Sequence, residues 1–550
     1  MSSAERIRAE LVRAARELGA AGDPEPTLEH PRDPSLGDWA TNLAMTLARP
    51  LRKRPADIAA ELRDRMSLAD AGVERIEIAG PGFMNFWLDP AHVAESVRGI
   101  IDANEAYGKT DQGKGQPVIV EFVSANPTGP LHVGHGRQAA LGDAISTLLE
   151  STGWNVTREF YYNDAGAQIE NLAASVSARI DELSGREGAI PEGGYHGEYI
   201  RELAERFIAE HKLNGTSADI DEVRKFAVAA LRHEQDLDLQ AFGVMFDSYF
   251  LESSLYTAGK VDETVEALVD SGKTYEDSGA LYLRTTEYGD DKDRVMKKSA
   301  EKGGDFTYFV PDVAYHVTKW QRGFHRAIDV QGADHHSTVT RVRAGLQALA
   351  MGIAPEYPEY VLHQMVTVMK GGEEMKISKR AGSYVTVRDL ISEVGRDAVR
   401  FFFLMRKSDS QLVFDIDVAV KQSEENPVYY VQMAHARMCG IFRVGEIDRE
   451  SFAAGSVDLS ELKEPEEQQL IKALTDFPAV VAGAAEALEP QRVVTYLTET
   501  ARLTHLWYHK HHVLGQPETV MQARLALARA AQIVIRNSLA ILGITAPERM

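Results

Sequence analysis

The sequence predicts an α/β protein of three units: a Rossmann-like parallel-sheet domain with a long insertion, a small α/β domain before it and an all-α domain after it. Strand-like and helical patterns alternate from about residue 117, as in parallel sheets. Mostly helical patterns interrupt this alternation, and nearly everything after about residue 397 is helical. A chain of 550 residues has room for three or four domains of about 150 residues. The predicted units are 1–108, 109–396 with an insertion at about 165–300, and 397–550.

The predicted N-terminal domain begins with a charged amphipathic helix, which differs from the apolar core of a signal peptide. A second helical pattern covers residues 39–63. Residues 73–78 and 83–88 are strand-like, and Gly80-Pro81-Gly82 between them predicts a tight turn. We therefore expect a small α/β domain here.

The predicted central domain opens on the apolar run 118–123, followed by a helical pattern to about residue 149 and a strand at 155–161. The insertion is mostly helical, with one strand pair near 281–286. Strand patterns return at residues 306–310, 327–331 and 360–369. A sheet divided by a long insertion is typical of a nucleotide-binding fold in two halves.

The predicted C-terminal domain is helical to its end, with a polar, acidic loop at about residues 445–467. A single cysteine, Cys439, excludes internal disulfides and a zinc site built from a cysteine cluster. No run of about 18 apolar residues occurs, so no transmembrane helix is predicted. Together these features favour a cytoplasmic protein with no membrane partner.

The formal net charge of -22 comes from 60 basic and 82 acidic residues. Nucleic-acid binding requires local positive surface rather than a basic average. The last 60 residues carry seven Lys and Arg against three Asp and Glu. The sequence therefore predicts a polarised molecule with its basic face near the C-terminal part. A solvated acidic surface is the alternative, which composition leaves open.

The most informative stretch is PLHVGHGR at residues 130–137, between the apolar run and the first helix of the central domain. His132 and His135 are three apart and share one face of the first helical turn. Gly134 allows close approach to the backbone, and a helix start favours phosphate. Histidines at this spacing are otherwise surface or capping residues, or a metal pair. The chain has no His-Glu-x-x-His, which argues against a metalloprotease.

A second motif, MKISKRAG at residues 375–382, favours the phosphate interpretation. It follows two glycines, which predict a mobile loop. Lys376, Lys379 and Arg380 place three cations within five residues, and Ser378 adds a donor, as a loop that clamps pyrophosphate requires. A basic surface loop is the alternative for this motif alone. Together the two motifs predict chemistry at the α-phosphate of ATP, and no Gly-x-x-x-x-Gly-Lys-Ser/Thr loop competes with them.

Acidic side chains near these motifs favour a cationic substrate. Glu121 lies in an otherwise apolar strand, where a carboxylate is unfavourable unless it is paired. Asn126 follows five residues later, and Asp312 stands four residues after Tyr308. Two carboxylates and a tyrosine around one pocket suit the planar, forked guanidinium group of arginine. The alternative for Glu121 is an internal salt bridge with a nearby Arg or Lys.

These motifs together resemble the bacterial arginyl-tRNA synthetases, a family of class I aminoacyl-tRNA synthetases. The resemblance runs through most of the chain. It is carried by PGFMNFWL, EFVSANPTGPLHVGHGR, TYFVPDVAYH, GADHH, MKISKRAGSYVTVRDL, EVGRDAVRFFFLMR, ENPVYYVQMAHAR and RNSLAILGITAPERM. Ile377 replaces the family's usual Met, and Arg380 replaces its usual final Ser, but both central lysines are kept.

The resemblance implies ATP-dependent ligation of L-arginine to tRNA(Arg) through an arginyl-adenylate, with release of pyrophosphate and AMP. It implies ATP with Mg²⁺ and no zinc. It also assigns roles to residues in three groups. These are arginine contacts at Glu121, Asn126, Tyr308 and Asp312, catalytic positions at His132, His135, Lys376 and Lys379, and further ATP contacts at Gly134, Gly332, Asp334 and Ser378.

The resemblance also implies that the N-terminal domain contacts the tRNA elbow and that the all-α domain binds the anticodon. Tyr430 and Trp507 are candidates for stacking on loop bases. Their alternative is a place in a helical core. The chain is expected to act as a monomer. One rival interpretation is a sister enzyme, either a class I synthetase for another amino acid or a small-molecule nucleotidyltransferase with the same HxGH turn. The other is an RNA-binding relative that has lost catalysis.

Overall fold

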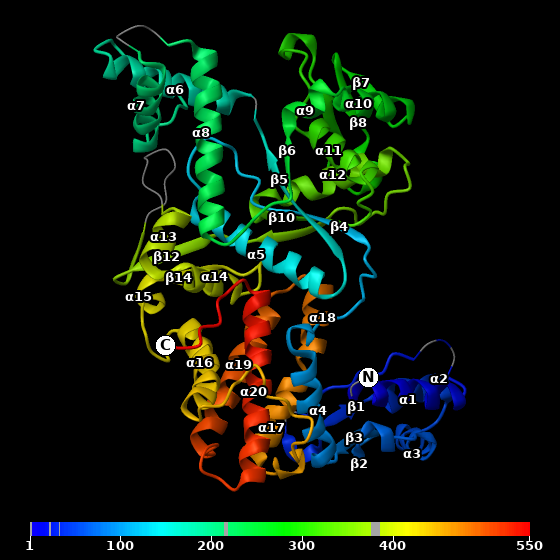
Figure 1. Cartoon of the computed structure of the whole chain (residues 1–550). Coiled ribbons are helices and arrows are strands. Elements are labelled where there is room, and N and C mark those ends of the chain that lie inside the picture. The colour runs from blue at the N-terminus through cyan, green and yellow to red at the C-terminus, as the bar shows by residue number, and fades with distance from the viewer. Residues whose placement is uncertain are drawn as a thin grey trace.

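The computed structural model describes residues 3–20, 22, 24–31, 33–164, 166–213, 218–375 and 385–550. A parallel sheet lies at the centre of the molecule, with two arms above it and the C-terminal helices below it (Figure 1). The N-terminal unit lies against the side of these helices. None of the described helices is long and apolar enough to span a membrane.

The N-terminal unit packs three helices against a small antiparallel sheet. Its elements are α1 (Ser3–Glu17), β1 (Trp39–Thr41), α2 (Leu43–Leu51), α3 (Pro55–Arg65), β2 (Val73–Ala79) and β3 (Phe83–Leu88), with the strand order β1-β3-β2. The strands predicted at 73–78 and 83–88 are confirmed. The single helix predicted at 39–63 is wrong. Pro50 stands in the last turn of α2, Arg52 adopts a left-handed conformation, and Pro55 begins α3 at a position that tolerates proline.

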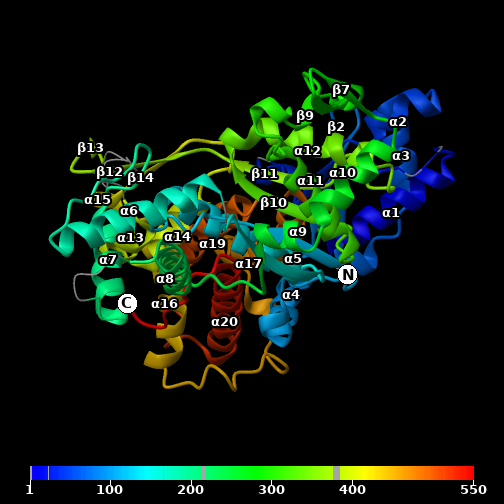
Figure 2. The same ribbon diagram turned by 90° about the horizontal axis from the view of Figure 1, so that it is seen from above.

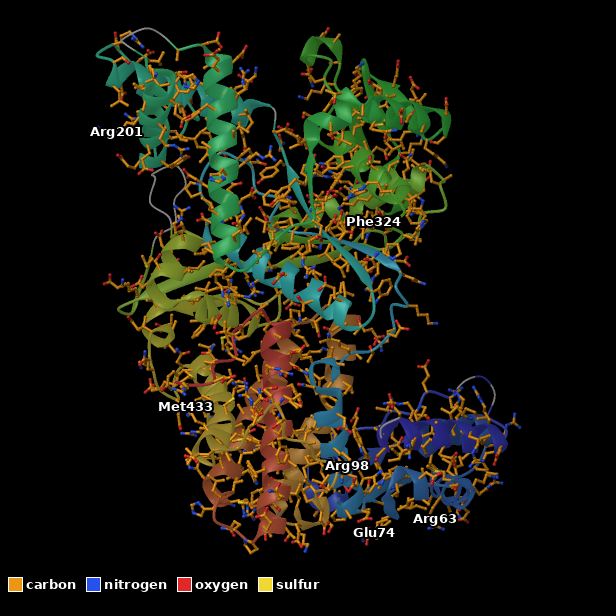
Figure 3. The ribbon with its side chains drawn as sticks, in the orientation of Figure 1. Arg63, Glu74, Arg98, Arg201, Phe324 and Met433 are labelled. Carbon is orange, nitrogen blue, oxygen red and sulfur yellow. The ribbon has the colours of Figure 1, made fainter. Side chains whose placement is uncertain are left out.

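Helix α4 (Pro90–Ala103) joins this unit to the C-terminal helices, packing against α17 (Pro465–Thr475) and α20 (Glu518–Ile541). The guanidinium of Arg98, labelled in Figure 3, donates to the carbonyl oxygens of Ala454 and Val457. Lys472 of α17 pairs with Asp38 of the N-terminal unit. These contacts attach the N-terminal unit to the helical domain rather than to the sheet.

The central sheet has five parallel strands in the order β11-β10-β4-β5-β6. Its strands are β4 (Pro117–Glu121), β5 (Asn155–Tyr162), β6 (Ser248–Leu251), β10 (Ala327–Gly332) and β11 (Glu359–His363). Helix α5 (Val133–Ser151) runs below the sheet and connects β4 to β5 (Figure 1). Because parallel strands end at the same edge, Glu121 and Gly332 are brought to one side of the sheet.

The predicted insertion contains a strand of this sheet. Helices α6 (Ala167–Leu183), α7 (Glu198–His211) and α8 (Ile220–Ala241) form the first arm. The chain then returns to the sheet as β6, which the sequence analysis missed. The second arm contains α9 (Glu252–Thr257), α10 (Lys260–Asp270), β7 (Thr274–Asp277), β8 (Ala280–Leu283) and β9 (Arg294–Lys297). Seen from above, the two arms stand apart (Figure 2).

The strand predicted at 306–310 is wrong, because helix α11 (Phe309–Gln321) begins there. Pro311 lies in its first turn, where no backbone N–H is needed, whereas a central strand excludes proline. Helix α11 packs against α12 (His336–Ala348). Tyr308 and Asp312 are therefore one turn apart at a helix start, rather than on one face of a strand.

A second small sheet contains β12 (Val366–Lys370), β13 (Glu373–Glu374) and β14 (Leu412–Asp415). Strand β12 pairs antiparallel with β13 and parallel with β14. Helices α13 (Val387–Val394) and α15 (Ile416–Ala419) flank this sheet (Figure 1). Strand β14 is an exception to the nearly all-helical structure expected after about residue 397.

The rest of the C-terminal part is helical, as predicted. Its helices are α14 (Arg396–Leu404), α16 (Pro427–Val444), α17, α18 (Phe477–Ala487), α19 (Gln491–Lys510) and α20, with the predicted acidic loop between α16 and α17. Arg400 of α14 is fully buried and joins three parts of the molecule. It donates to Asp143 of α5 at 2.5 Å, to Phe242 O at 3.2 Å and to Leu542 O at 2.9 Å.

Candidate active site

The HVGH turn begins α5 at the carboxyl edge of the central sheet, and its two histidines cap that helix. His132 Nδ1 accepts from the backbone N–H of Gly134 at 3.1 Å, and His135 Nδ1 accepts from His132 N at 3.3 Å. The rings stack with centroids 3.7 Å apart. Because each Nδ1 accepts, the proton of a neutral ring lies on Nε2, where it can be donated to phosphate. A Cβ at Gly134 would lie 2.9 Å from the His132 ring, so the turn requires glycine.

The described chain that follows the MKISKRAG segment lies beside this turn. Lys376, Ser378 and Lys379 lie outside the described residues, but the chain resumes at Val385. The carbonyl of Val385 accepts from the N–H of Val133 at 3.3 Å, and two residues later a backbone N–H donates to Leu131 O at 2.9 Å. The chain just after the second motif, from Val385, is therefore hydrogen-bonded to the backbone of the first motif.

Gly332 ends β10 at the same edge, and Asp334 follows it in an exposed position. The amide of Gln138 on α5 donates to the carbonyl of Val330, which ties the histidine helix to β10. A Cβ at Gly332 would meet only Asp334 Oδ1, the end of an exposed side chain that can move aside, so local packing does not require glycine there. The predicted ATP positions among the described residues thus share one edge of the sheet.

Glu121 ends β4 at this edge, where it is paired with Lys319 of α11. Lys319 Nζ lies 2.6 Å from Glu121 Oε2 and 2.8 Å from Asp329 Oδ1, and its side chain is fully buried. Ser124 Oγ donates to Glu121 Oε1 at 2.8 Å. The internal salt bridge that the sequence left as an alternative is therefore present. A carboxylate offers about four lone-pair positions, so Glu121 keeps acceptor capacity for a guanidinium.

The cluster around Lys319 is dominated by carboxylates. Burial lowers the pKa of Lys319, but the charges of Asp329 and Glu121 outweigh it and raise that pKa above its usual range. Despite burial, Lys319 and His316 hold the pKa of Asp329 below its usual range. Sequence analysis missed Lys319, which stands seven residues, about two helical turns, after Asp312. That signal becomes visible only when residues 309–321 are read as a helix.

Asp312 differs from Glu121, because no described side chain forms a hydrogen bond or ion pair with its carboxylate. Burial raises the pKa of Asp312 to about 7; the charge of Arg341 opposes this rise, and the charges of Glu252 and Glu121 add to it. A carboxyl with this pKa is partly protonated near neutral pH, and a bound cation favours its ionised form. Tyr308, one turn earlier, is 74% exposed and lies at the surface rather than deep in the site.

Asn126 lies in the loop between β4 and the HVGH turn. Its Nδ2 donates to Gln168 Oε1 of α6 at 2.7 Å. The first arm therefore reaches the same edge of the sheet as the two predicted carboxylates.

The two tRNA candidates occupy different environments. Trp507 is fully buried in α19, so its ring cannot stack on a base. It lies in the helical core, which was the alternative interpretation. Tyr430 of α16 is half-buried, and its ring centroid lies 4.5 Å from that of His505. Of the two, only Tyr430 is accessible enough to stack on a nucleotide.

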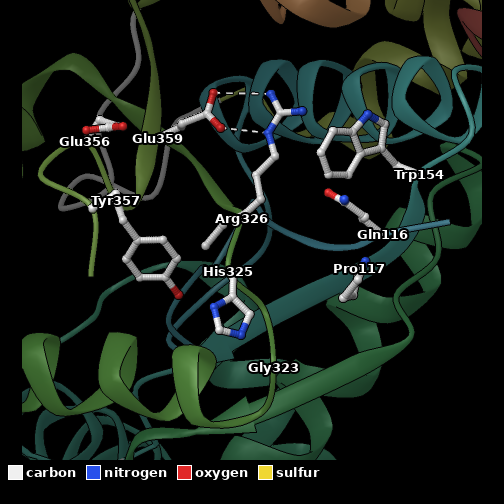
Figure 4. Close-up of a pocket in the computed structure, with 11 residues that line it drawn as sticks. Gln116, Pro117, Trp154, Gly323, His325, Arg326, Glu356, Tyr357 and Glu359 are labelled. Atoms are coloured by element: carbon white, nitrogen blue, oxygen red, sulfur yellow. Dashed lines mark hydrogen bonds and ion pairs between the residues drawn. The ribbon is translucent and has the colours of Figure 1, made fainter. Parts of the chain in front are cut away.

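A cavity of about 590 Å³ opens at the opposite, amino edge of the central sheet (Figure 4). It is bordered by strand starts, including Pro117 of β4 and Glu359 of β11. The Arg326 guanidinium lies 4.6 Å from the centre of the Trp154 ring and pairs with Glu359 at 2.7 Å. None of the predicted site residues lines this cavity, so it is separate from the candidate active site.

Three family profiles match the chain in the order of its units. They are "Arginyl tRNA synthetase N terminal domain" at residues 4–88, "tRNA synthetases class I (R), catalytic domain" at residues 96–438 and "DALR anticodon binding domain" at residues 431–550.

Curated relatives are similar over nearly their whole length. An arginine–tRNA ligase of Herminiimonas arsenicoxydans is 53% identical over 572 residues, covering 98% of each chain. Another, from Geotalea daltonii, is 54% identical over 543 residues, covering 97% of this chain and 96% of that one. The solved arginyl-tRNA synthetase of Thermus thermophilus matches 99% of this chain and 100% of that one with a TM-score of 0.79, at 24% identity, and so supports the fold.

Proposed function

The chain belongs to the arginyl-tRNA synthetase family, and on that premise we propose that arginine and ATP react at the carboxyl edge of its central sheet. The activity is the ATP-dependent ligation of L-arginine to tRNA. The main support for the proposed site is that three features lie close together. The HVGH turn, the chain at Val385 that follows the MKISKRAG segment, and the Glu121 carboxylate all lie at this edge.

The reaction has two steps. The arginine carboxylate attacks the α-phosphate of ATP, which forms arginyl-adenylate and releases pyrophosphate. The terminal ribose hydroxyl of tRNA then attacks the adenylate carbonyl, and AMP leaves. No side chain needs to act as a nucleophile, so the protein contributes positioning and stabilisation of charge.

In this proposal the carboxylates of Asp312 and Glu121 bind the guanidinium group of arginine. Carboxylates match its forked donors. The buried carboxylates also exceed the buried ammonium there, because the single ammonium of Lys319 lies between Glu121 and Asp329. Asn126 supplies a neutral contact to the amino acid, and Tyr308 covers the site from the surface.

ATP lies against the start of α5 in the same proposal. The Nε2 atoms of His132 and His135 donate to its phosphates, and Gly134 allows the nucleotide to approach the helix start. Gly332 and Asp334 contact the nucleoside side. The loop cations Lys376 and Lys379, with Ser378, neutralise the leaving pyrophosphate.

Mg²⁺ accompanies ATP in this proposal. Within the part of the chain that the structure describes, no group of three or more His, Cys, Asp and Glu could hold a metal ion. We therefore expect phosphate oxygens and water to supply most of its ligands, as is usual for Mg²⁺.

Binding of tRNA(Arg) involves both outer units in this proposal. The N-terminal unit contacts the tRNA elbow, and the helical unit binds the anticodon, with Tyr430 as a stacking candidate. The units divide near residues 108 and 396, although β14 crosses the second division to pair with β12. We place the protein in the cytoplasm, and propose a monomer because one chain carries all three matched units. Light scattering of the purified protein tests the monomer.

Aminoacylation of tRNA with each of the twenty amino acids tests the specificity. We expect charging with arginine, and charging with lysine or glutamate instead would contradict the guanidinium site. Calorimetric titration of arginine into Glu121→Ala and Asp312→Ala then tests its location. Unchanged affinity in both variants would mean that arginine binds elsewhere.

A further inference from the structure

Gln235 of α8 reaches from the helical arm into the loop between β4 and the HVGH turn. The residue is only 1% exposed. Its Nε2 donates to the carbonyl oxygen of Asn126 at 3.1 Å and to that of Gly129 at 2.9 Å. Its Oε1 has no hydrogen-bond partner among the described residues. Gln235 therefore serves this loop as a buried double donor.

The loop that Gln235 holds begins in an unfavourable backbone conformation. Val123 has a φ of 68° and Ser124 a φ of 39°. Non-glycine residues rarely adopt this region, and β-branched residues least of all. Such strain persists only where surrounding contacts maintain it, and it is frequent at ligand sites. Ser124 also donates to Glu121, so the strained turn bears directly on a proposed guanidinium ligand.

The other helices of the first arm support the same loop. The hydroxyl of Tyr199 on α7 donates to Thr128 O at 2.8 Å, and Gln168 on α6 accepts from Asn126 Nδ2. Of these three contacts, that of Gln235 is the one that binds two backbone groups of the loop.

Helix α8 itself is anchored to the rest of the catalytic unit. Asp238, one turn after Gln235, is buried, and its Oδ1 lies 2.6 Å from Arg388 Nε of α13. At the end of the helix, Arg400 donates to Phe242 O. Figure 1 shows α8 running from the arm down to α13 and the helical domain. The amide donor of Gln235 therefore lies on a helix that these contacts hold in place.

We propose that Gln235 is a positioning residue for arginine, which acts by holding residues 126–129 in the shape that presents Asn126 to the bound amino acid. This inference rests on the proposed arginine contact of Asn126. Without the amide donor, the Gly129 carbonyl loses its hydrogen bond and the Asn126 carbonyl keeps only that of the Thr128 N–H, so the strained loop relaxes away from the substrate.

Calorimetric titration of arginine and steady-state aminoacylation of the full-length Gln235→Met variant test the proposal. Methionine keeps the length of the side chain but donates no hydrogen bond. We expect the Kd and KM for arginine to rise about tenfold or more, with the KM for ATP and kcat changing far less. Gln240→Met, at an exposed position of the same helix, is the matched control and should bind arginine like the wild type.

Gln235→Glu adds a readout that a purely structural role would not move. When the introduced carboxyl is protonated it can donate one hydrogen bond, and when ionised it repels both carbonyl oxygens. The ratio of variant to wild-type Kd for arginine should therefore fall as the pH is lowered from 8 to 6. A ratio that stays constant over this range would overturn the proposal, and this test remains open if the methionine variant does not fold.

Asn126→Ala separates this inference from the proposed function. Weaker arginine binding in Asn126→Ala, with a smaller effect of Gln235→Met in that background, supports the inference. Unchanged binding in Asn126→Ala removes the assigned contact and the inference with it. Weaker binding in Asn126→Ala with fully additive effects of Gln235→Met leaves the proposed site intact and overturns the role of Gln235.

Discussion

The two edges of the central sheet treat charge in opposite ways. At the amino edge, Arg326 and Glu359 form a bidentate pair with N–O distances of 2.7 and 3.3 Å, and the guanidinium also covers Trp154. At the carboxyl edge, the ammonium of Lys319 is shared by two carboxylates, and Asp312 has no described partner. Positive and negative charge are paired one to one at Arg326 and Glu359, whereas the carboxylates at the carboxyl edge outnumber the ammonium of Lys319.

The difference in charge pairing indicates which edge of the sheet is the better candidate for binding a cation. The Arg326–Glu359 pair at the amino edge is satisfied within the protein, so it does not itself require an ionic ligand. Unbalanced buried charge is unfavourable, and proteins retain it mainly where a ligand or a reaction requires it. This criterion supports the proposed placement of arginine at the carboxyl edge, although a cavity of about 590 Å³ lies at the amino edge.

Removing charge at the carboxyl edge should have the largest effect. Asp312→Asn keeps the shape of the side chain but offers the guanidinium one acceptor oxygen and no charge. We expect kcat/KM for arginine to fall by about 10³–10⁴-fold, because a site built for specific donors discriminates strongly. Steady-state aminoacylation at saturating ATP and tRNA measures it. A variant with wild-type kcat/KM would show that the guanidinium binds elsewhere.

Lys319→Met tests whether the cluster beneath Asp312 is held by its single ammonium. The substitution leaves Glu121 and Asp329 buried without their shared cation. We expect the free energy of unfolding to fall by about 3–5 kcal/mol, the range for removing one partner of a buried pair. Urea denaturation followed by circular dichroism measures this change. A loss under about 1 kcal/mol would mean that water already screens the cluster.

The pH dependence of arginine binding tests the unpaired state of Asp312, whose pKa is raised to about 7 by burial. Arginine binds the ionised carboxylate, whose fraction rises from roughly a tenth at pH 6 to about nine tenths at pH 8. The Kd for arginine should therefore fall about tenfold over this interval when measured by calorimetric titration. Asp312→Asn should show a flat profile, and an equally steep profile in that variant would assign the titration to another group.

The same carboxyl acts in the opposite direction on the arginine-free protein. Because the pKa of Asp312 is higher in the folded chain, folding binds its proton more tightly. Its contribution to the free energy of unfolding is therefore fully present below about pH 4 and is lost as the pH rises through about 7. Arginine binding and stability of the free protein thus change with pH in opposite senses at this residue.

Sequence reasoning could predict the strands that carry the site, because β4 is an apolar run and β5 and β10 are rich in β-branched and aromatic residues. It could not predict β6 or β14, each four residues long, since so short a segment has no distinct period and is defined by its sheet partners. The alternating side chains at 306–310 resembled a strand, and only Pro311 signalled the helix start.

The sequence motifs predicted residues of the proposed site, but they did not predict how the charged residues there are paired. His132, His135 and Glu121 stand in local patterns that survive without a structure. Lys319 was missed because its pairing with Glu121 joins residues 198 apart in the chain. Trp507 could not be separated from a surface aromatic by sequence, because its burial depends on packing among helices rather than on its neighbours in sequence.

The smallest effect is expected at the amino edge, where Glu359→Gln breaks a balanced pair. The side chains of Arg326 and Glu359 are 22% and 37% exposed, so water screens their attraction. The amide that replaces the carboxylate still accepts one hydrogen bond, and the guanidinium keeps its place over Trp154. We expect the free energy of unfolding to change by less than about 1 kcal/mol, measured by the same urea denaturation. Arginine kcat/KM should stay within about twofold of wild type, because the substitution lies at the far ends of the strands. A loss of arginine kcat/KM comparable to that of Asp312→Asn would mean that charge at one edge controls binding at the other. The pairing of charges within the protein would then no longer distinguish the two edges.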